Sequence, residues 1–183
     1  MLIGDRIVVR PVENEDIPTI FQWSSDYELK ELFDFRVAFL NKDELCSEVE
    51  KYRTDERTID LCIADKSSKR IVGRCVLTEV DFINKKANCF LYIGEQEFIG
   101  KGYGTEALHI IMDYAFNKLN LNRLESYVFD FNKKAIKCYK RCGLKVEGII
   151  REGVYRRGKY HDIYIMGILK CEYEEMTDGG DIA

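Results

Sequence analysis

The chain has 183 residues, of which 46% are apolar and 33% charged, and its formal net charge is -4. This composition is typical of one globular domain and excludes a disordered or fibrous protein. The acidic balance, with no dominant run of lysine or arginine, argues against a nucleic-acid partner. The apolar stretches are too short to span a membrane and the N-terminus lacks an export signal, so we expect a cytoplasmic protein without a membrane partner.

The first half of the chain predicts two helices between strands. Residues 5–10 contain a run of β-branched residues, which predicts a strand that ends at Pro11. Apolar residues at helical spacing predict a helix up to about Ser24 and another over residues 42–52. Residues 27–40 between them follow no clear period. Three strands are then predicted, over residues 58–64, 70–80 and 87–93.

The second half continues with alternating helices and strands. A long amphipathic helix follows residues 100–104, and residues 132–142 predict a shorter helix closed by glycine. Strands are predicted over residues 123–128, 145–152 and 161–170. These elements predict an α/β (α+β) fold with a sheet of about seven strands and about four flanking helices. We expect one domain over residues 1–175 and a polar tail over residues 176–183.

The seven cysteines are scattered along the chain, and several lie inside apolar segments. Their odd number and placement favour reduced thiols. Cys138 and Cys142 would share one helix face, but a metal site would need two further ligands that no other Cys or His cluster supplies. We therefore expect no metal.

A glycine-rich turn precedes the long helix, with glycines at alternate positions in Gly100, Lys101, Gly102, Tyr103, Gly104 and Thr105. Glycines let backbone N–H groups converge, and a helix N-terminus adds partial positive charge, so the turn could hold a pyrophosphate. The third glycine comes one residue too early for a dinucleotide fold, and the spacing does not fit a P-loop. A tight turn that binds nothing is the alternative.

A second feature lies about thirty residues further along the chain. Asn132 is suited to cap a helix, and Tyr139 follows two helical turns later on the same face. Both side chains can therefore face one groove. Taken alone, Tyr139 would more often be a half-buried packing tyrosine.

In this order, the two features make the chain resemble the GNAT superfamily of N-acetyltransferases. Within it, the chain is most similar to the branch of ribosomal-protein N-terminal and spermidine acetyltransferases, from residues 6–11 to residues 160–166. The family's pyrophosphate loop, Q/R-x-x-G-x-G/A, falls on Ile99, Gly102 and Gly104, and Ile99 departs from the polar first position. The family's N-x-x-A-x-x-x-Y helix matches without a break at Asn132, Ala135 and Tyr139.

The resemblance implies acetyl-CoA as the cosubstrate and a mixed sheet that is splayed in its middle. The opening would form where residues 87–93 part from residues 123–128, and the pantetheine arm would enter it. The residues that this implies for binding acetyl-CoA are Leu91, Tyr92, Ile93, Gly100, Lys101, Gly102, Tyr103, Gly104, Thr105, Asn132, Lys134 and Tyr139.

The resemblance also implies how the reaction is catalysed. Tyr139 would act as the general acid that protonates the departing thiolate. Glu79 is the candidate general base, although a solvent-facing strand glutamate is the alternative. Many relatives have an acidic residue where this chain has Asn88, which leaves a water chain as another route for the proton.

These features predict an enzyme that acetylates a primary amine, either a small-molecule amine such as a polyamine or a peptide N-terminus. Residues 27–40 and 154–160 would contact this acceptor. The alternative is a non-catalytic acyl-CoA sensor or interaction module that keeps the fold without turnover. Edge strands in the C-terminal half could pair two copies into a homodimer.

Overall fold

The computed structural model describes residues 1–32 and 41–178. Its eight strands form one sheet: β1 (Leu2–Ile3), β2 (Ile7–Pro11), β3 (Ile59–Asp65), β4 (Ile71–Asp81), β5 (Lys86–Ile93), β6 (Arg123–Phe129), β7 (Lys145–Arg156) and β8 (Lys159–Leu169). The helices are α1 (Ile17–Ser25), α2 (Tyr27–Glu31), α3 (Lys42–Thr54), α4 (Tyr103–Asp113), α5 (Lys133–Arg141) and α6 (Lys170–Asp178). This α/β architecture confirms the predicted fold class.

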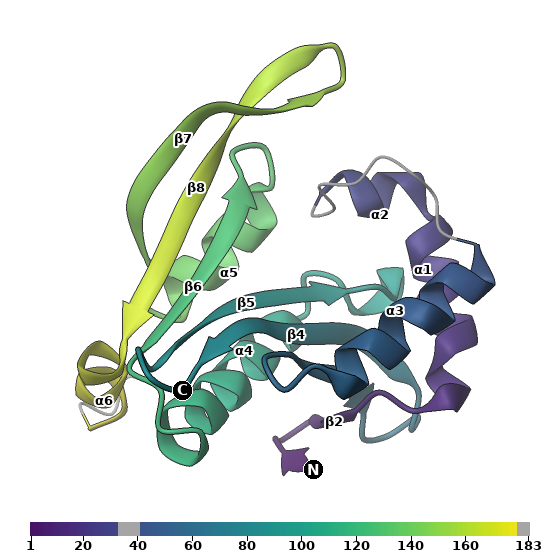
Figure 1. Ribbon diagram of the computed structural model, residues 1–183, viewed down its shortest axis with the longest axis horizontal. Helices are drawn as coiled ribbons and strands as arrows, with labels where there is room; N and C mark the ends of the chain where they lie inside the picture. Colours follow the sequence, from purple (N-terminus) through teal and green to yellow (C-terminus); the bar gives the residue numbers. More distant parts are fainter. Residues whose placement is uncertain (33–40, 179–183) are drawn as a thin grey trace.

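The sheet is mixed, with the strand order β1-β2-β3-β4-β5-β6-β8-β7. β5 and β6 are parallel and pair over a short stretch that ends at Asn88 opposite Glu125. The other neighbouring strands of the described chain are antiparallel. Beyond Asn88 the two strands part, and Figure 1 shows β6, β8 and β7 rising away from β4 and β5. The sheet is therefore splayed in its middle, as predicted.

Alternate side chains of a strand pack into two hydrophobic cores, one on each face of the sheet. Leu61 and Ile63 of β3 pack in a core that α4 and α5 cover, whereas Cys62 and Ala64 pack in a second core that α1 and α3 cover. Successive strand residues point to opposite faces, so a strand covered on both sides is apolar along its whole length. Figure 1 shows α3 and α4 on the two sides of the sheet.

The structure has more elements than the sequence predicts. The added strand is β1, which pairs with β2 through Leu2 and Ile3. The added helices are α2, in the segment without a clear period, and α6. α6 continues to Asp178, so it includes the first residues of the expected polar tail, and residues 179–183 of that tail lie outside the described residues. Tyr173 of α6 is buried against Phe116, with ring centroids 5.2 Å apart. None of the described helices is long and apolar enough to cross a membrane.

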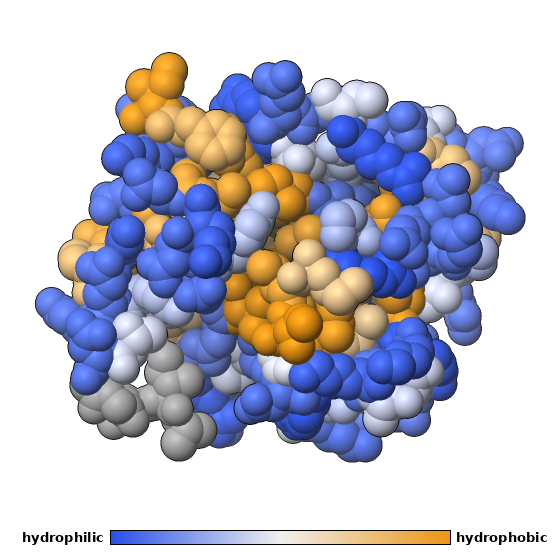
Figure 2. Space-filling model, turned by 90° about the horizontal axis from the view of Figure 1, so that it is seen from below, coloured by the Kyte–Doolittle hydropathy of each residue, from blue (hydrophilic) through white to orange (hydrophobic). Residues whose placement is uncertain are grey.

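One face of the molecule carries a patch of apolar residues. Figure 2, which views the molecule from below, shows this patch in the middle of the face with hydrophilic residues around it. Elsewhere in the chain, the edge strand β7 exposes Ile149 and Ile150. Edge strands in the C-terminal half of the chain are expected to pair two copies into a homodimer, and this homodimer stays a prediction.

Candidate active site

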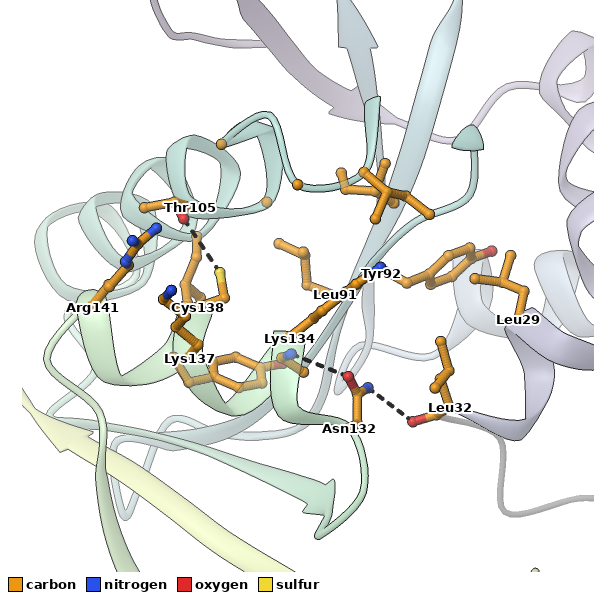
Figure 3. A pocket seen from close by; sticks show the side chains of 18 residues that line it. Leu29, Leu32, Leu91, Tyr92, Thr105, Asn132, Lys134, Lys137, Cys138 and Arg141 are labelled. Atoms are coloured by element: carbon orange, nitrogen blue, oxygen red, sulfur yellow. Dashed lines mark hydrogen bonds between the residues drawn. The ribbon is translucent and has the colours of Figure 1, made fainter. Parts of the chain in front are cut away.

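A cavity of about 360 Å³ opens where β5 and β6 part. Its walls come from the end of α2, from β5, from the glycine turn with the start of α4, and from α5 (Figure 3). The lining residues are Leu29, Leu32, Leu91, Tyr92, Ile93, Ile99, Gly100, Gly102, Gly104, Thr105, Leu108, Asn132, Lys134, Ala135, Lys137, Cys138, Tyr139 and Arg141. Ten of the twelve predicted binding residues are among them, and Lys101 and Tyr103 are not.

The first wall is the open edge of β5. Leu91, Tyr92 and Ile93 pair with β4 on one side, but they lie beyond Asn88, where the pairing with β6 ends. In the described chain, Leu91 and Ile93 therefore have no ladder partner on the β6 side. An unpaired strand edge offers N–H and C=O groups to an extended ligand, and the amide-rich pantetheine arm fits such an edge.

The second wall is the glycine turn. Gly102 is the N-cap of α4 with φ of 88°, a left-handed conformation that glycine adopts without strain. No side chain of the described residues caps this helix, so its first N–H groups lack an intrahelical or side-chain partner. Such amides bind phosphate oxygens, and the helix dipole adds favourable charge.

The third wall is α5, which adds positive charge to the pocket. Lys134, Lys137 and Arg141 line it from one helix face (Figure 3). Their spacing of three and four residues places them one above the other along the helix. Together with the amides of the glycine turn, these cations suit the phosphate groups of coenzyme A.

The space between the walls fits a slender ligand. A Cβ atom at Gly104 would lie 3.7 Å from Cδ2 of Leu91 and 3.8 Å from both Sγ of Cys138 and Cγ1 of Ile93. These are ordinary contact distances, so even one extra carbon would bridge β5 and α5. The absence of a side chain at Gly104 therefore keeps the pocket open, and the residues present fit coenzyme A.

Tyr139 lines this pocket from α5 and is largely buried. Burial raises the pKa of its phenol well above the usual value, and a hydrogen bond with Ser126 opposes this only in part. The phenol therefore stays protonated over the physiological pH range and can donate a proton inside the pocket.

Asn132 caps α5, as its sequence context predicts, and it also lines the pocket. Its Oδ1 accepts a hydrogen bond from the N–H of Ala135 at 3.1 Å and so caps α5. Its Nδ2 donates to the carbonyl of Leu32 at 3.1 Å (Figure 3). Both polar atoms are thus engaged within the protein, and Asn132 joins α5 to the end of α2 at the edge of the pocket.

Lys101 and Tyr103 support the glycine turn from outside the pocket. The carbonyl of Lys101 accepts a hydrogen bond from Nη1 of Arg6 at 2.8 Å, and that guanidinium lies 4.7 Å from the ring centroid of Tyr103. The Tyr103 hydroxyl donates to Oδ1 of the buried Asp65 at 2.8 Å. These contacts tie the start of α4 to the residue that precedes β2 and to the end of β3.

Replacing Tyr103 by phenylalanine should remove the hydrogen bond to Asp65 and lower the free energy of unfolding by about 1–2 kcal/mol. Thermal unfolding should show a Tm decrease of roughly 2–8 °C. The matched control is Tyr155→Phe, because the Tyr155 side chain is exposed on β7. Equal Tm values for the Tyr103 variant and the wild type would contradict an anchoring role.

Glu79 does not line the pocket. It lies in an irregular part of β4, between Thr78 and Asp81, with φ of 52°. Its Oε2 accepts a hydrogen bond from Nδ2 of Asn88 at 2.8 Å, and Asn88 occupies the last paired position before β5 and β6 part. Glu79 is exposed to solvent at the origin of the opening, so a water molecule would have to link it to the pocket.

Several lining residues of the pocket could not be identified from the two sequence motifs. Lys137, Cys138 and Arg141 share a helix face with Lys134 and Ala135, and their spacing was a signal that could have found them. Leu29 and Leu32 come from the segment without a clear period, where no signal was present. Residues 33–40 of that segment, which the sequence assigns to the acceptor site, lie outside the described residues.

Comparisons with known proteins agree with this geometry. Residues 6–145 match the family model described as an acetyltransferase (GNAT) domain. The spermidine N(1)-acetyltransferase of Escherichia coli K12 is 29% identical over 180 residues, which cover 94% of this chain and 92% of the relative. A putative ribosomal N-acetyltransferase of Bacillus subtilis is 36% identical over 104 residues, which cover 57% of this chain and 56% of the relative.

Among solved structures, the chain is similar to the spermidine N-acetyltransferase of Vibrio cholerae in complex with CoA and spermine. The TM-score is 0.86 at 27% identity, with 92% of this chain and 98% of that chain covered. The protein belongs to the GNAT family of acetyltransferases. It is therefore an acyl-CoA-dependent acyltransferase.

Proposed function

We propose that the protein transfers the acetyl group of acetyl-CoA to a primary amine of a polyamine or similar small molecule. One observation carries this proposal: the pocket that contains the free amides at the start of α4 is also lined by Tyr139, a buried and protonated phenol. The amides can then bind the diphosphate of a coenzyme whose sulfur receives a proton from Tyr139.

Acetyl-CoA supplies an acetyl group activated as a thioester. The acceptor nitrogen attacks this carbonyl carbon directly, so that a C–N bond forms and the C–S bond breaks. Tyr139 donates its phenolic proton to the departing sulfur, and the nitrogen gives up a proton to Glu79 through water. A backbone N–H of the open β5 edge, in the stretch from Leu91 to Ile93, stabilises the carbonyl oxygen as it gains negative charge.

The acceptor is expected to enter between α2 and the β7–β8 hairpin. Nε of Arg157 in the hairpin donates to Oε2 of Glu31 in α2 at 2.6 Å, and this pair ties the two sides of the opening together. A small, flexible amine is the proposed acceptor. The relatives named as spermidine acetyltransferases support the same acceptor class.

An amine panel tests the proposal. The protein would be incubated with acetyl-CoA and spermidine, spermine, putrescine, lysine or a short peptide, with thiol release and product mass as readouts. We expect acceptor-dependent thiol release and acetylated spermidine or spermine. Acetylation of the peptide alone would refute a polyamine acceptor, and acetyl-CoA binding without thiol release for any amine would favour a non-catalytic sensor.

Replacing Glu79 by glutamine should lower kcat/KM about tenfold near pH 7, because the amide cannot take a proton from the amine. Glutamine can still accept the hydrogen bond from Asn88, so the fold is retained. The defect should shrink as pH rises, since the free amine is then abundant. Glu97→Gln, an exposed glutamate elsewhere, is the control. An equal defect at every pH would contradict the role as base.

The pH profile is set by two protons. kcat/KM should rise from about pH 6 to about pH 10 as the acceptor amine loses its proton. Burial raises the pKa of Tyr139, so its acidic form persists above the usual range and no alkaline decrease is expected in this window. A steady-state profile with one acetyl donor checks this. A decrease with a midpoint below about pH 9 would mean that a different acid protonates the thiolate.

A further inference from the structure

Two thiols lie on the same side of α5, one turn apart. Sγ of Cys138 is 3.5 Å from Oγ1 of Thr105, and the Cys142 thiol points to the carbonyl of Thr105 at 3.8 Å. Both thiols therefore meet the same residue of the first turn of α4. Figure 3 shows Cys138 directed toward Thr105 across the pocket wall.

The two thiols differ in access. Cys138 is partly exposed and lines the pocket, so a small solute that enters the pocket can reach it. Cys142 is fully buried behind it. In such an arrangement the accessible thiol is oxidised first. The buried thiol can then react with the oxidised sulfur, so no thiol from another molecule is needed.

The pKa shifts of the two thiols favour the same order of reaction, with Cys138 first and Cys142 second. Polar interaction with Cys142 and with Thr105, together with the charge of Arg141, outweighs burial and lowers the pKa of Cys138. The interaction with Cys138 and burial raise the pKa of Cys142. The pocket-facing sulfur is thus the better nucleophile, because the thiolate is the reactive form of cysteine.

We propose that Cys138 is an oxidation site for small peroxides in the wall of the acyl-CoA pocket, and that Cys142 resolves the oxidised form into a disulfide. The Cys138 thiolate attacks one peroxide oxygen, an S–O bond forms, the O–O bond breaks, and hydroxide leaves as water after protonation. The Cys142 sulfur then attacks Cys138, an S–S bond forms, the S–O bond breaks, and the Cys142 proton leaves with the oxygen as a second water. Two thiols and one hydrogen peroxide give one disulfide and two waters.

The disulfide requires a local change in α5. Side chains one turn apart have Cβ atoms about 5–6 Å apart, whereas a disulfide needs about 3.5–4.5 Å. Cys142 is the C-cap with φ of -86° and ψ of 11°, so the chain is already leaving the helix there and can adjust. Tyr139 lies between the two cysteines, and the change should move it and narrow the pocket.

Another close pair provides a contrast. Sγ of Cys75 and Sγ of Cys89 lie 3.9 Å apart, but both residues are buried in the sheet core. Hydrogen bonding to Cys89 and burial raise the pKa of Cys75. The sulfur atoms of Cys75 and Cys89 are in contact, but neither residue lines the pocket, whereas Cys138 does.

Peptide mapping tests the proposal without any assay of turnover. The whole protein would be treated with hydrogen peroxide near pH 7, then alkylated and digested with trypsin, which cleaves between the two cysteines. We expect a disulfide that links residues 138–140 to residues 142–145. Saturating acetyl-CoA, which has no free thiol to react with peroxide, should slow disulfide formation about tenfold. The oxidised protein should bind acetyl-CoA about tenfold more weakly until dithiothreitol is added.

Variants identify which thiol reacts first. In Cys142→Ser, and in Cys142→Ala in case serine is poorly tolerated in the core, dimedone should trap a sulfenic acid on Cys138. Cys138→Ser should give neither the adduct nor the linked peptide, and the exposed-thiol control Cys171→Ser should behave like the wild type. The proposal would be overturned if the oxidised wild type gave no linked peptide. It would also be overturned if dimedone labelled Cys46 or Cys171 and left Cys138 unmodified.

Discussion

Replacement of Tyr139 by phenylalanine is expected to lower kcat about 100-fold while leaving the Kd for CoA within a few-fold of the wild type. The phenyl ring fills the same buried space, so only the hydroxyl and its hydrogen bond with Ser126 are lost. Without this proton donor, the sulfur would have to leave as an unprotonated thiolate in a pocket with low access to water. The loss should therefore appear in kcat rather than in binding.

Steady-state kinetics with the best amine of the panel, together with calorimetric titration of CoA, would separate the two effects. Tyr173→Phe is the matched control, because Tyr173 is also a buried tyrosine but packs against Phe116, away from the pocket. That variant should keep kcat near the wild-type value. If Tyr139→Phe turns over within a few-fold of the wild type, the assigned role of the phenol as general acid is wrong.

The parts of the site that depend on local backbone chemistry could be predicted from the sequence. The conformations of the glycine turn at Gly100 and Gly102 and of the capped helix from Asn132 to Tyr139 are determined by a few local residues. Glycine is favoured where φ is positive, and asparagine where a helix begins, whatever the rest of the chain does. Both features could therefore be located before the fold was known.

The side-chain roles in the same motifs could not be predicted in this way. Tyr103 follows Gly102 directly, yet its hydroxyl contacts Asp65 from a strand that is distant in the sequence. Besides the predicted cap, Asn132 donates from Nδ2 to the carbonyl of Leu32, one hundred residues away in the sequence. Such contacts depend on tertiary packing, and no local pattern encodes them.

The helices that the sequence does not predict also depend on tertiary packing. α2 has one turn of helix and no clear apolar period, and Asp26 stabilises it by accepting a hydrogen bond from Leu29. α6 looks polar in the sequence because it places Tyr173 in the core and leaves most of its other residues at the surface. Short or one-sided helices gain their stability from a few buried contacts, so the sequence period alone does not reveal them.

The pocket itself depends on Gly104, and this leads to a second strong prediction. Gly104 lies inside α4 with an ordinary helical conformation, unlike Gly102, so a side chain there causes no backbone strain. Replacing glycine by alanine where the backbone conformation suits both stabilises a protein by about 0.4–1 kcal/mol, because the unfolded chain has fewer accessible states. The same methyl group would meet Leu91, Ile93 and Cys138 across the pocket. Stability and coenzyme binding should therefore change in opposite directions.

Gly104→Ala is expected to raise the free energy of unfolding by about 0.4–1 kcal/mol and to weaken CoA binding about tenfold, and Gly104→Leu should weaken binding by more than about 100-fold. Chemical denaturation measures the first quantity and calorimetric titration the second. Gly148→Ala is the matched control, because a Cβ there meets Ile165 on the β7–β8 hairpin at 3.5 Å and the site is remote from the pocket. The opposite signs matter, since a variant that merely disturbed the fold would lose stability and binding together. If Gly104→Leu binds CoA as tightly as the wild type, the ligand does not pass between β5 and α5, and Tyr139 would not be close to the departing sulfur.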